Sequence, residues 1–119
     1  MIRTCAPGTR TLVAHEVNVP RCCPFSGNPV SGTFRLAYRP SAGIVLPVED
    51  LAAMVEGYVG GRGAIRGMEE MIQEIAQRCA DSVRVPIRAH ADLRIVPPFG
   101  GDLQRLLVRV RCAPEVIHA

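Results

Sequence analysis

The sequence predicts an α+β domain in which an antiparallel four-stranded sheet packs on two helices, with the chain order β-β-α-α-β-β. Two observations predict this fold class. Apolar residues alternate with polar ones, as in strands, over residues 9–19, 34–38, 83–95 and 105–112. Between residues 47 and 79 they recur instead every three or four positions, as in helices. Helices on one face of an antiparallel sheet satisfy both patterns.

The first two strands are predicted from alternation on either side of a proline-rich turn. Over residues 9–19, Val13, His15 and Val17 alternate with Ala14 and Glu16. The second strand ends before Pro40, and its apolar members are Phe34, Leu36 and Tyr38.

Two helices follow. Pro47 suits the first turn of a helix over residues 47–59, because its missing N–H is not needed there. The second helix carries Glu69 and Glu70 in its first turn, where carboxylates interact favourably with the helix dipole. Its continuous apolar stripe comprises Met68, Met71, Ile72, Ile75, Ala76 and Cys79.

The last two strands, over residues 83–95 and 105–112, place mainly arginine on their polar face. The members are Arg84, Arg88, Arg94, Arg105, Arg109 and Arg111. All 14 basic residues of the chain are arginine, which grips phosphates and carboxylates with two hydrogen bonds. This face is therefore either solvated, engaged in ion pairs between subunits, or a phosphate-tracking surface for tRNA or DNA. The open edges of the sheet favour a homo-oligomer that covers them.

Length and composition indicate one domain over residues 1–119, with its core at about 9–112. No run of about 18 apolar residues predicts a membrane span, and "MIRTCAPGTR" lacks the apolar segment of a secretory signal. We therefore expect a cytoplasmic protein. In that reducing compartment, five irregularly spaced cysteines do not predict a disulfide framework.

The stretch "RCCPFSGNP", residues 21–29, places two thiols at a predicted turn. A thiol there is a nucleophile, a metal ligand, half of a disulfide or a small apolar side chain. A zinc site built from Cys5, His15, Cys22 and Cys23 lacks the usual ligand pair two to four residues apart, so we expect no metal.

The string "CPFSGNPVSGTFRLAY", residues 23–38, resembles the segment that follows the nucleophile in the QueF-like family of 7-cyano-7-deazaguanine enzymes. In that family a Tyr-x-Pro follows at the same spacing, here Tyr38-Arg39-Pro40. The stretch "VEDLAAMVEGYVGGRGAIRGMEEMIQEI" is more similar to the archaeosine synthase branch than to the reductases. The resemblance covers roughly residues 10–112. It implies the tunnelling fold, whose subunits assemble into a barrel as pentamers or decamers.

The resemblance also implies a site. Cys23 matches the nucleophile that forms a thioimide with the nitrile carbon, and Glu69, or its neighbour Glu70, matches the glutamate that binds the deazaguanine edge. Ammonia then attacks the thioimide and gives an amidine, with the substrate a free base or part of tRNA or DNA. Arg21 and the N–H groups of the turn are suited to lowering the thiol pKa.

The chain departs from the family pattern at three places. The usual aspartate, thought to donate a proton, is Val30, and the histidine before the glutamate is Met68. The candidate substitute donors are His15, Glu16 and Ser26. The NADPH motif of the reductases is replaced by "VLPVEDL", and the chain has no lysine, so we expect no NADPH and no other cofactor. The alternative function is a non-catalytic protein that binds a deazapurine or a pterin.

Overall fold

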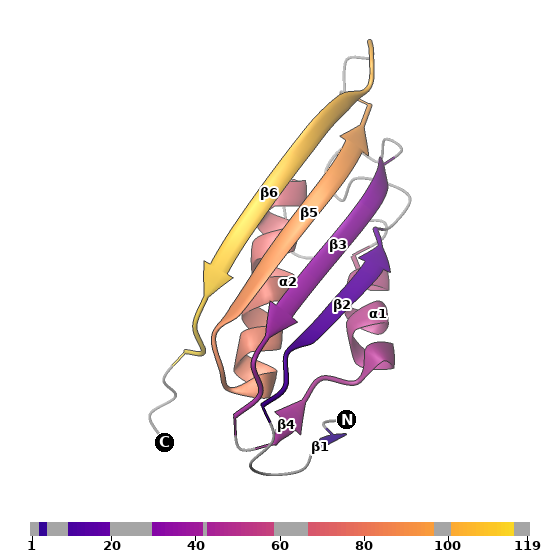
Figure 1. Ribbon diagram of the computed structural model, residues 1–119. Coiled ribbons are helices and arrows are strands. Elements are labelled where there is room, and N and C mark those ends of the chain that lie inside the picture. Colours follow the sequence, from indigo (N-terminus) through magenta and orange to yellow (C-terminus); the bar gives the residue numbers. More distant parts are fainter. Residues whose placement is uncertain are drawn as a thin grey trace.

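The predicted strands pair into one antiparallel sheet of order β2-β3-β5-β6 (Figure 1). The computed structural model describes residues 3–4, 10–19, 30–41, 43–58, 67–96 and 101–115. The sheet strands are β2 (Val13–Asn18), β3 (Val30–Tyr38), β5 (Ile87–Ile95) and β6 (Gln104–Cys112). Two short strands, β1 (Arg3–Thr4) and β4 (Ile44–Val45), pair separately. The predicted α+β class is therefore confirmed.

Helices α1 (Val48–Glu56) and α2 (Met68–Val83) cover one face of the sheet and leave the other face open (Figure 1). The apolar stripe predicted for the second helix is buried, and Ala80 and Val83 extend it. This stripe packs on the inward side chains of the strands, among them Phe34, Leu36 and Leu93. The described parts of the chain contain no helix with the length and apolar character needed to cross a bilayer.

Two tyrosines in the core each form a hydrogen bond through the side-chain hydroxyl group. The Tyr38 hydroxyl accepts a hydrogen bond from the backbone N–H of Leu46 at 2.7 Å, which ties β3 to the segment before α1. The Tyr58 hydroxyl donates to the Glu74 carboxylate at 2.6 Å, which ties the end of α1 to α2. Buried aromatic residues with a polar atom need such partners.

Several predicted boundaries differ from those observed. The third main strand was expected from Val83, but α2 continues to Val83 and β5 begins at Ile87. Val83 and Val85 are both buried, so their spacing imitates a strand across the helix end. Arg84 has a left-handed conformation (φ 62°) at the C-cap of α2, which removes it from the arginine face of the sheet. Pro86 then prevents the helix from continuing.

Two further boundaries shift by a few residues. Strand β3 starts at Val30, four residues before the predicted start, because Val30 and Phe34 both face the core. Helix α1 ends at Glu56, with Gly57 as its C-cap, rather than at residue 59. The expected sheet and helices therefore exist, and only their ends move.

Candidate functional site

The candidate residues Cys5, Cys22, Cys23 and Ser26 lie outside the described residues. The last three belong to the segment of residues 20–29, called here the cysteine segment. Its two flanks are described: Val19 and Val30 are buried at the same end of the sheet. Helix α2 begins at that end too, because it runs antiparallel to β5 (Figure 1). The topology therefore brings the start of α2 to the sheet end that residues 20–29 connect.

Glu69 and Glu70 occupy the first turn of α2 and are exposed. Gly67 is the N-cap, and within the described segments no side-chain hydrogen bond caps this helix end. The first backbone N–H groups and the helix dipole favour negative charge there, which suits acidic side chains in this turn. Met68, which stands in place of the family's histidine, is instead a core residue.

Val30 is part of the apolar core. It is 5% exposed, pairs with Ile95 across the sheet and packs in the same cluster as Phe34. The position that holds an aspartate in the QueF-like pattern therefore holds an apolar side chain in apolar surroundings.

His15 and Glu16 lie on opposite faces of β2, because they are consecutive in a strand. His15 faces the helices and is 9% exposed. Glu16 is on the open face, where its carboxylate lies 3.5 Å from the Arg35 guanidinium. Only one of these two candidate donors can therefore face any given substrate in the same subunit.

The His15 imidazole is buried without a complete set of hydrogen bonds. Its ring stacks on Tyr38 with centroids 6.3 Å apart, and its Nε2 has no hydrogen-bond partner among the residues that the structure describes. Burial lowers the His15 pKa from its usual value, because the charged form loses its water. The neutral ring is the form that this position favours.

The two described cysteines are unsuited to nucleophilic attack. Burial raises the pKa of Cys79 to about 12, and its thiol lies 3.8 Å from the Met54 sulfur. Burial also raises the pKa of the half-buried Cys112. A thiolate is therefore disfavoured at both positions.

The metal alternative gains no ligands from the described segments. Across them, histidine, cysteine and carboxylate side chains do not gather in any group of three or more. Of the four residues considered for zinc, only His15 is described.

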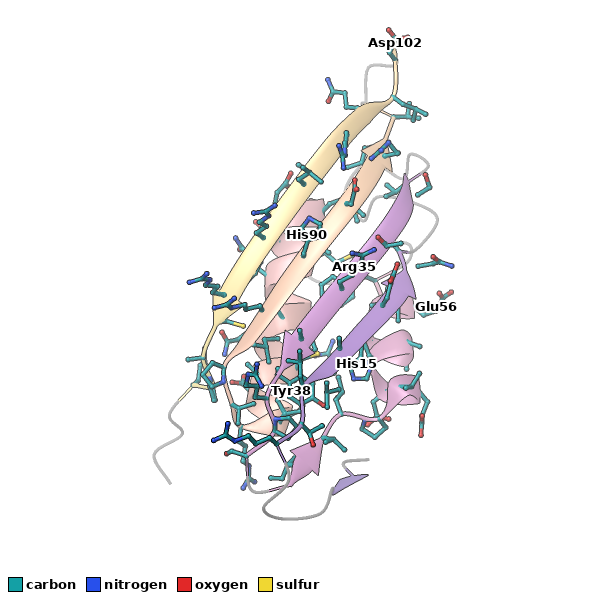
Figure 2. The ribbon with its side chains drawn as sticks, viewed as in Figure 1. His15, Arg35, Tyr38, Glu56, His90 and Asp102 are labelled. Atoms are coloured by element: carbon teal, nitrogen blue, oxygen red, sulfur yellow. The ribbon has the colours of Figure 1, made fainter. Side chains whose placement is uncertain are left out.

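The open face of the sheet carries a groove of about 670 Å³. Strand pairing aligns its side chains in two rows. The first row is Glu16, Arg35, His90 and Arg109, and the second is Ala14, Ala37, Arg88 and Arg111. Figure 2 shows Arg35 and His90 on this face. Arg35 was not assigned to the arginine face from the sequence, although its alternation with Phe34 and Leu36 contains that signal.

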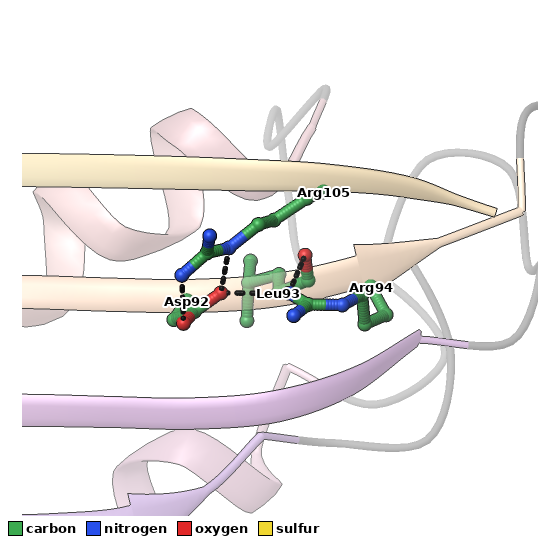
Figure 3. Close-up of polar contacts among 4 residues, drawn as sticks. All are labelled: Asp92, Leu93, Arg94 and Arg105. Carbon is green, nitrogen blue, oxygen red and sulfur yellow. Dashed lines mark hydrogen bonds and ion pairs between the residues drawn. The ribbon is translucent and has the colours of Figure 1, made fainter.

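At the other end of the open face, Asp92 forms ion pairs with two of the predicted arginines (Figure 3). Its carboxylate accepts hydrogen bonds from Arg105 at 2.8 and 3.0 Å and from Arg94 at 2.8 Å. By contrast, Arg88, Arg109 and Arg111 are exposed and have no ion pair with a carboxylate in the described segments. Most of the uncompensated positive charge of the face therefore lies at the end away from Asp92, on Arg88, Arg109 and Arg111 of β5 and β6.

No model of a known protein family matches this chain, and no curated protein matches it in sequence.

Proposed function

We propose that the protein is a QueF-like enzyme that converts the nitrile of 7-cyano-7-deazaguanine into an amidine. The observation that carries the proposal is the arrangement of the sheet end. The start of α2, with two exposed carboxylates, lies at the sheet end where the described chain stops at Val19 and resumes at Val30 (Figure 1). Cys23 belongs to the segment between these two residues. The α+β architecture is compatible with the tunnelling fold that the resemblance implies.

The reaction has two covalent steps. The Cys23 thiolate adds to the nitrile carbon, and the electron pair of one C–N π bond moves to nitrogen, which takes a proton and leaves a thioimide. Ammonia then adds to the same carbon, and the C–S bond breaks to return the thiolate. Neither step needs an oxidant or reductant, so NADPH has no part in it.

Glu69, with Glu70 as the alternative, binds the substrate. A carboxylate accepts two parallel hydrogen bonds from the N1–H and amino group of a guanine-like base. A base that lacks these donors leaves the carboxylate unpaired, and this discriminates strongly between substrates. A base anchored at the start of α2 then has to present its nitrile to the cysteine segment.

The proton donor is a separate question, because Val30 supplies no proton. The candidates remain His15, Glu16 and Ser26. His15 would donate from the core side of β2 and Glu16 from the open face, so the two require different positions of the nitrile. Adduct formation in His15→Gln and Glu16→Gln distinguishes them, since loss of the true donor slows the thioimide step and loss of the other does not.

We also propose that subunits assemble into a barrel, as a pentamer or decamer, in the reducing cytoplasm. Within the described chain, β2 and β6 are the edge strands of the sheet. Pairing between these edges would satisfy their outward backbone groups. Light scattering on the purified chain measures the assembly, and a monomer at micromolar concentration would contradict the barrel.

The decisive experiment is intact-mass spectrometry of the protein mixed with 7-cyano-7-deazaguanine. We expect an adduct equal to the mass of the base, absent in Cys23→Ala and retained in the adjacent control Cys22→Ala. Ammonia should then release the amidine. Absence of the adduct at every pH, with binding of the base intact, contradicts the proposal.

A second candidate function is non-catalytic binding of a deazapurine or pterin. The buried, apolar Val30 favours it, because the position of the family's proton donor has become part of the core. This function predicts binding that survives Cys23→Ala and is lost in Glu69→Ala, without any covalent adduct.

A further inference from the structure

Each end of the open face carries a pair of arginines directly opposite each other on β5 and β6, and in the described chain only one of the two pairs binds a carboxylate. At one end Arg94 on β5 lies directly opposite Arg105 on β6, and at the other end Arg88 lies directly opposite Arg111. Like charges directly opposite each other repel. Asp92 lies between the first pair and accepts hydrogen bonds from both arginines (Figure 3). The second pair has no corresponding carboxylate among the residues that the structure describes.

The surroundings of the second pair favour a multiply charged anion. Arg109 adds a third exposed guanidinium two positions along β6 from Arg111. Guanidinium groups bind phosphate through paired, charge-assisted hydrogen bonds. Arg88 and Arg111 also line a second hollow of about 850 Å³, so an anion between them lies where two hollows meet.

The remainder of the groove differs from this basic corner. Ala14 and Ala37, directly opposite each other on β2 and β3, form a floor of small side chains. Beside them the Glu16–Arg35 ion pair offers a hydrogen-bond acceptor and several donors. The groove crosses the sheet from β2 to β6, which are three strand spacings or about 14 Å apart. This width matches the length of a single nucleotide rather than that of a polymer.

We infer that the open face binds a small nucleotide-like ligand. Its phosphate chain lies on Arg88, Arg109 and Arg111, and its uncharged base and sugar lie over Ala14 and Ala37. The charge pattern argues against a DNA or RNA strand as the ligand. Binding a nucleic-acid backbone needs basic side chains along its whole length. Here the half of the groove on β2 and β3 contains an ion pair without net charge and two alanines. This site does not include Cys23, and it shares Glu16 with the candidate proton donors of the nitrile reaction.

The test is isothermal titration of the full chain with ATP, inorganic tripolyphosphate and a short oligothymidylate of the same net charge as ATP, at constant ionic strength. We expect ATP to bind more tightly than tripolyphosphate, because only ATP covers the alanine floor. Arg111→Gln should weaken ATP binding by about tenfold, the loss of one charge-assisted pair of hydrogen bonds. The matched control Arg105→Gln, on the same strand and face, should change it by less than about threefold.

Four outcomes overturn the inference. They are no binding of ATP, equal loss in Arg111→Gln and Arg105→Gln, equal affinity for ATP and tripolyphosphate, and tighter binding of the oligothymidylate than of ATP. Without ATP binding there is no site, and an equal loss in the two variants would mean that only the overall positive charge attracts ATP. Equal affinity for ATP and tripolyphosphate would show that Ala14 and Ala37 contribute nothing, and tighter binding of the oligothymidylate would favour a nucleic-acid surface.

Urea unfolding of Arg111→Gln should match that of the unmodified chain, because Arg111 is exposed and has no ion pair with a carboxylate in the described segments. Arg105→Gln loses its two hydrogen bonds to Asp92 and should unfold at a lower urea concentration, so its binding is compared under conditions where urea unfolding shows that the variant is folded.

Discussion

Arg105 on β6 binds Asp92 on β5 through two parallel hydrogen bonds, Nε to Oδ1 at 3.0 Å and Nη2 to Oδ2 at 2.8 Å (Figure 3). Arg94 adds a third at 2.8 Å. Hydrogen bonds from Arg105 and then Arg94 hold the pKa of the Asp92 carboxyl below its usual range. One carboxylate thereby allows two opposed arginines to lie on one face, and it makes this end of the face less positive than the end that carries Arg88 and Arg111.

Asp92→Asn should lower the free energy of unfolding at neutral pH, because Arg94 and Arg105 then repel each other without a counter-charge. The difference between Asp92→Asn and the unmodified chain should depend on pH. Because folding lowers the Asp92 pKa, its stabilisation is present above the unfolded pKa of about 3.9 and is lost as pH falls further. Urea unfolding at a series of pH values, with Glu16→Gln as an exposed control, measures this. A difference that persists unchanged in strong acid contradicts it.

His15→Phe should raise the free energy of unfolding at neutral pH by about 1 kcal/mol. It removes a buried nitrogen that has no hydrogen-bond partner within the described part of the chain, and it keeps a ring beside Tyr38. The gain should grow as pH falls below about 6.5, where the unfolded chain protonates His15 and the folded chain resists it. The control is His90→Phe on the open face. An equal pH dependence in both variants would show that burial of His15 is not the cause.

Val30→Asp should destabilise the fold by about 3 kcal/mol or more, because the carboxylate would be buried among apolar side chains with no cation. Val30→Ala should cost less, about 2 kcal/mol, since it leaves only a small cavity. Chemical denaturation of both variants gives the comparison. If Val30→Asp is as stable as the unmodified chain, then the side chain at this position reaches water or a partner.

Gly32→Ala should be far more harmful than Gly101→Ala. Both glycines have positive φ, 142° and 108°, so each alanine is strained, at a cost of about 1 to 3 kcal/mol. A Cβ at Gly32 would also lie 2.1 Å from the Asp92 carbonyl oxygen, whereas a Cβ at Gly101 meets nothing within 4 Å. The strands β3 and β5 would have to separate. Thermal unfolding of the two variants should therefore differ by many degrees, and similar midpoints would disprove the close approach.

The fold class could be predicted because local pattern and burial agree along most of the chain. The stripe on α2 and the alternation on β5 each have one period and one buried face, so either alone identifies its element. Prediction failed at the junction of these elements. Val83 and Val85 are two residues apart and both buried, and only the left-handed Arg84 shows that a helix ends between them.

The sequence by itself determined which side chains face the core and which face outward, because side-chain direction follows from local periodicity. Only the tertiary structure decided which outward side chains are neighbours. The pairing of β5 with β6 brings Asp92 to Arg105 and leaves Arg88 opposite Arg111, and no local pattern contains that register. Register depends on contacts between strands far apart in the chain. The distribution of charge on the open face can therefore be determined only from the folded sheet.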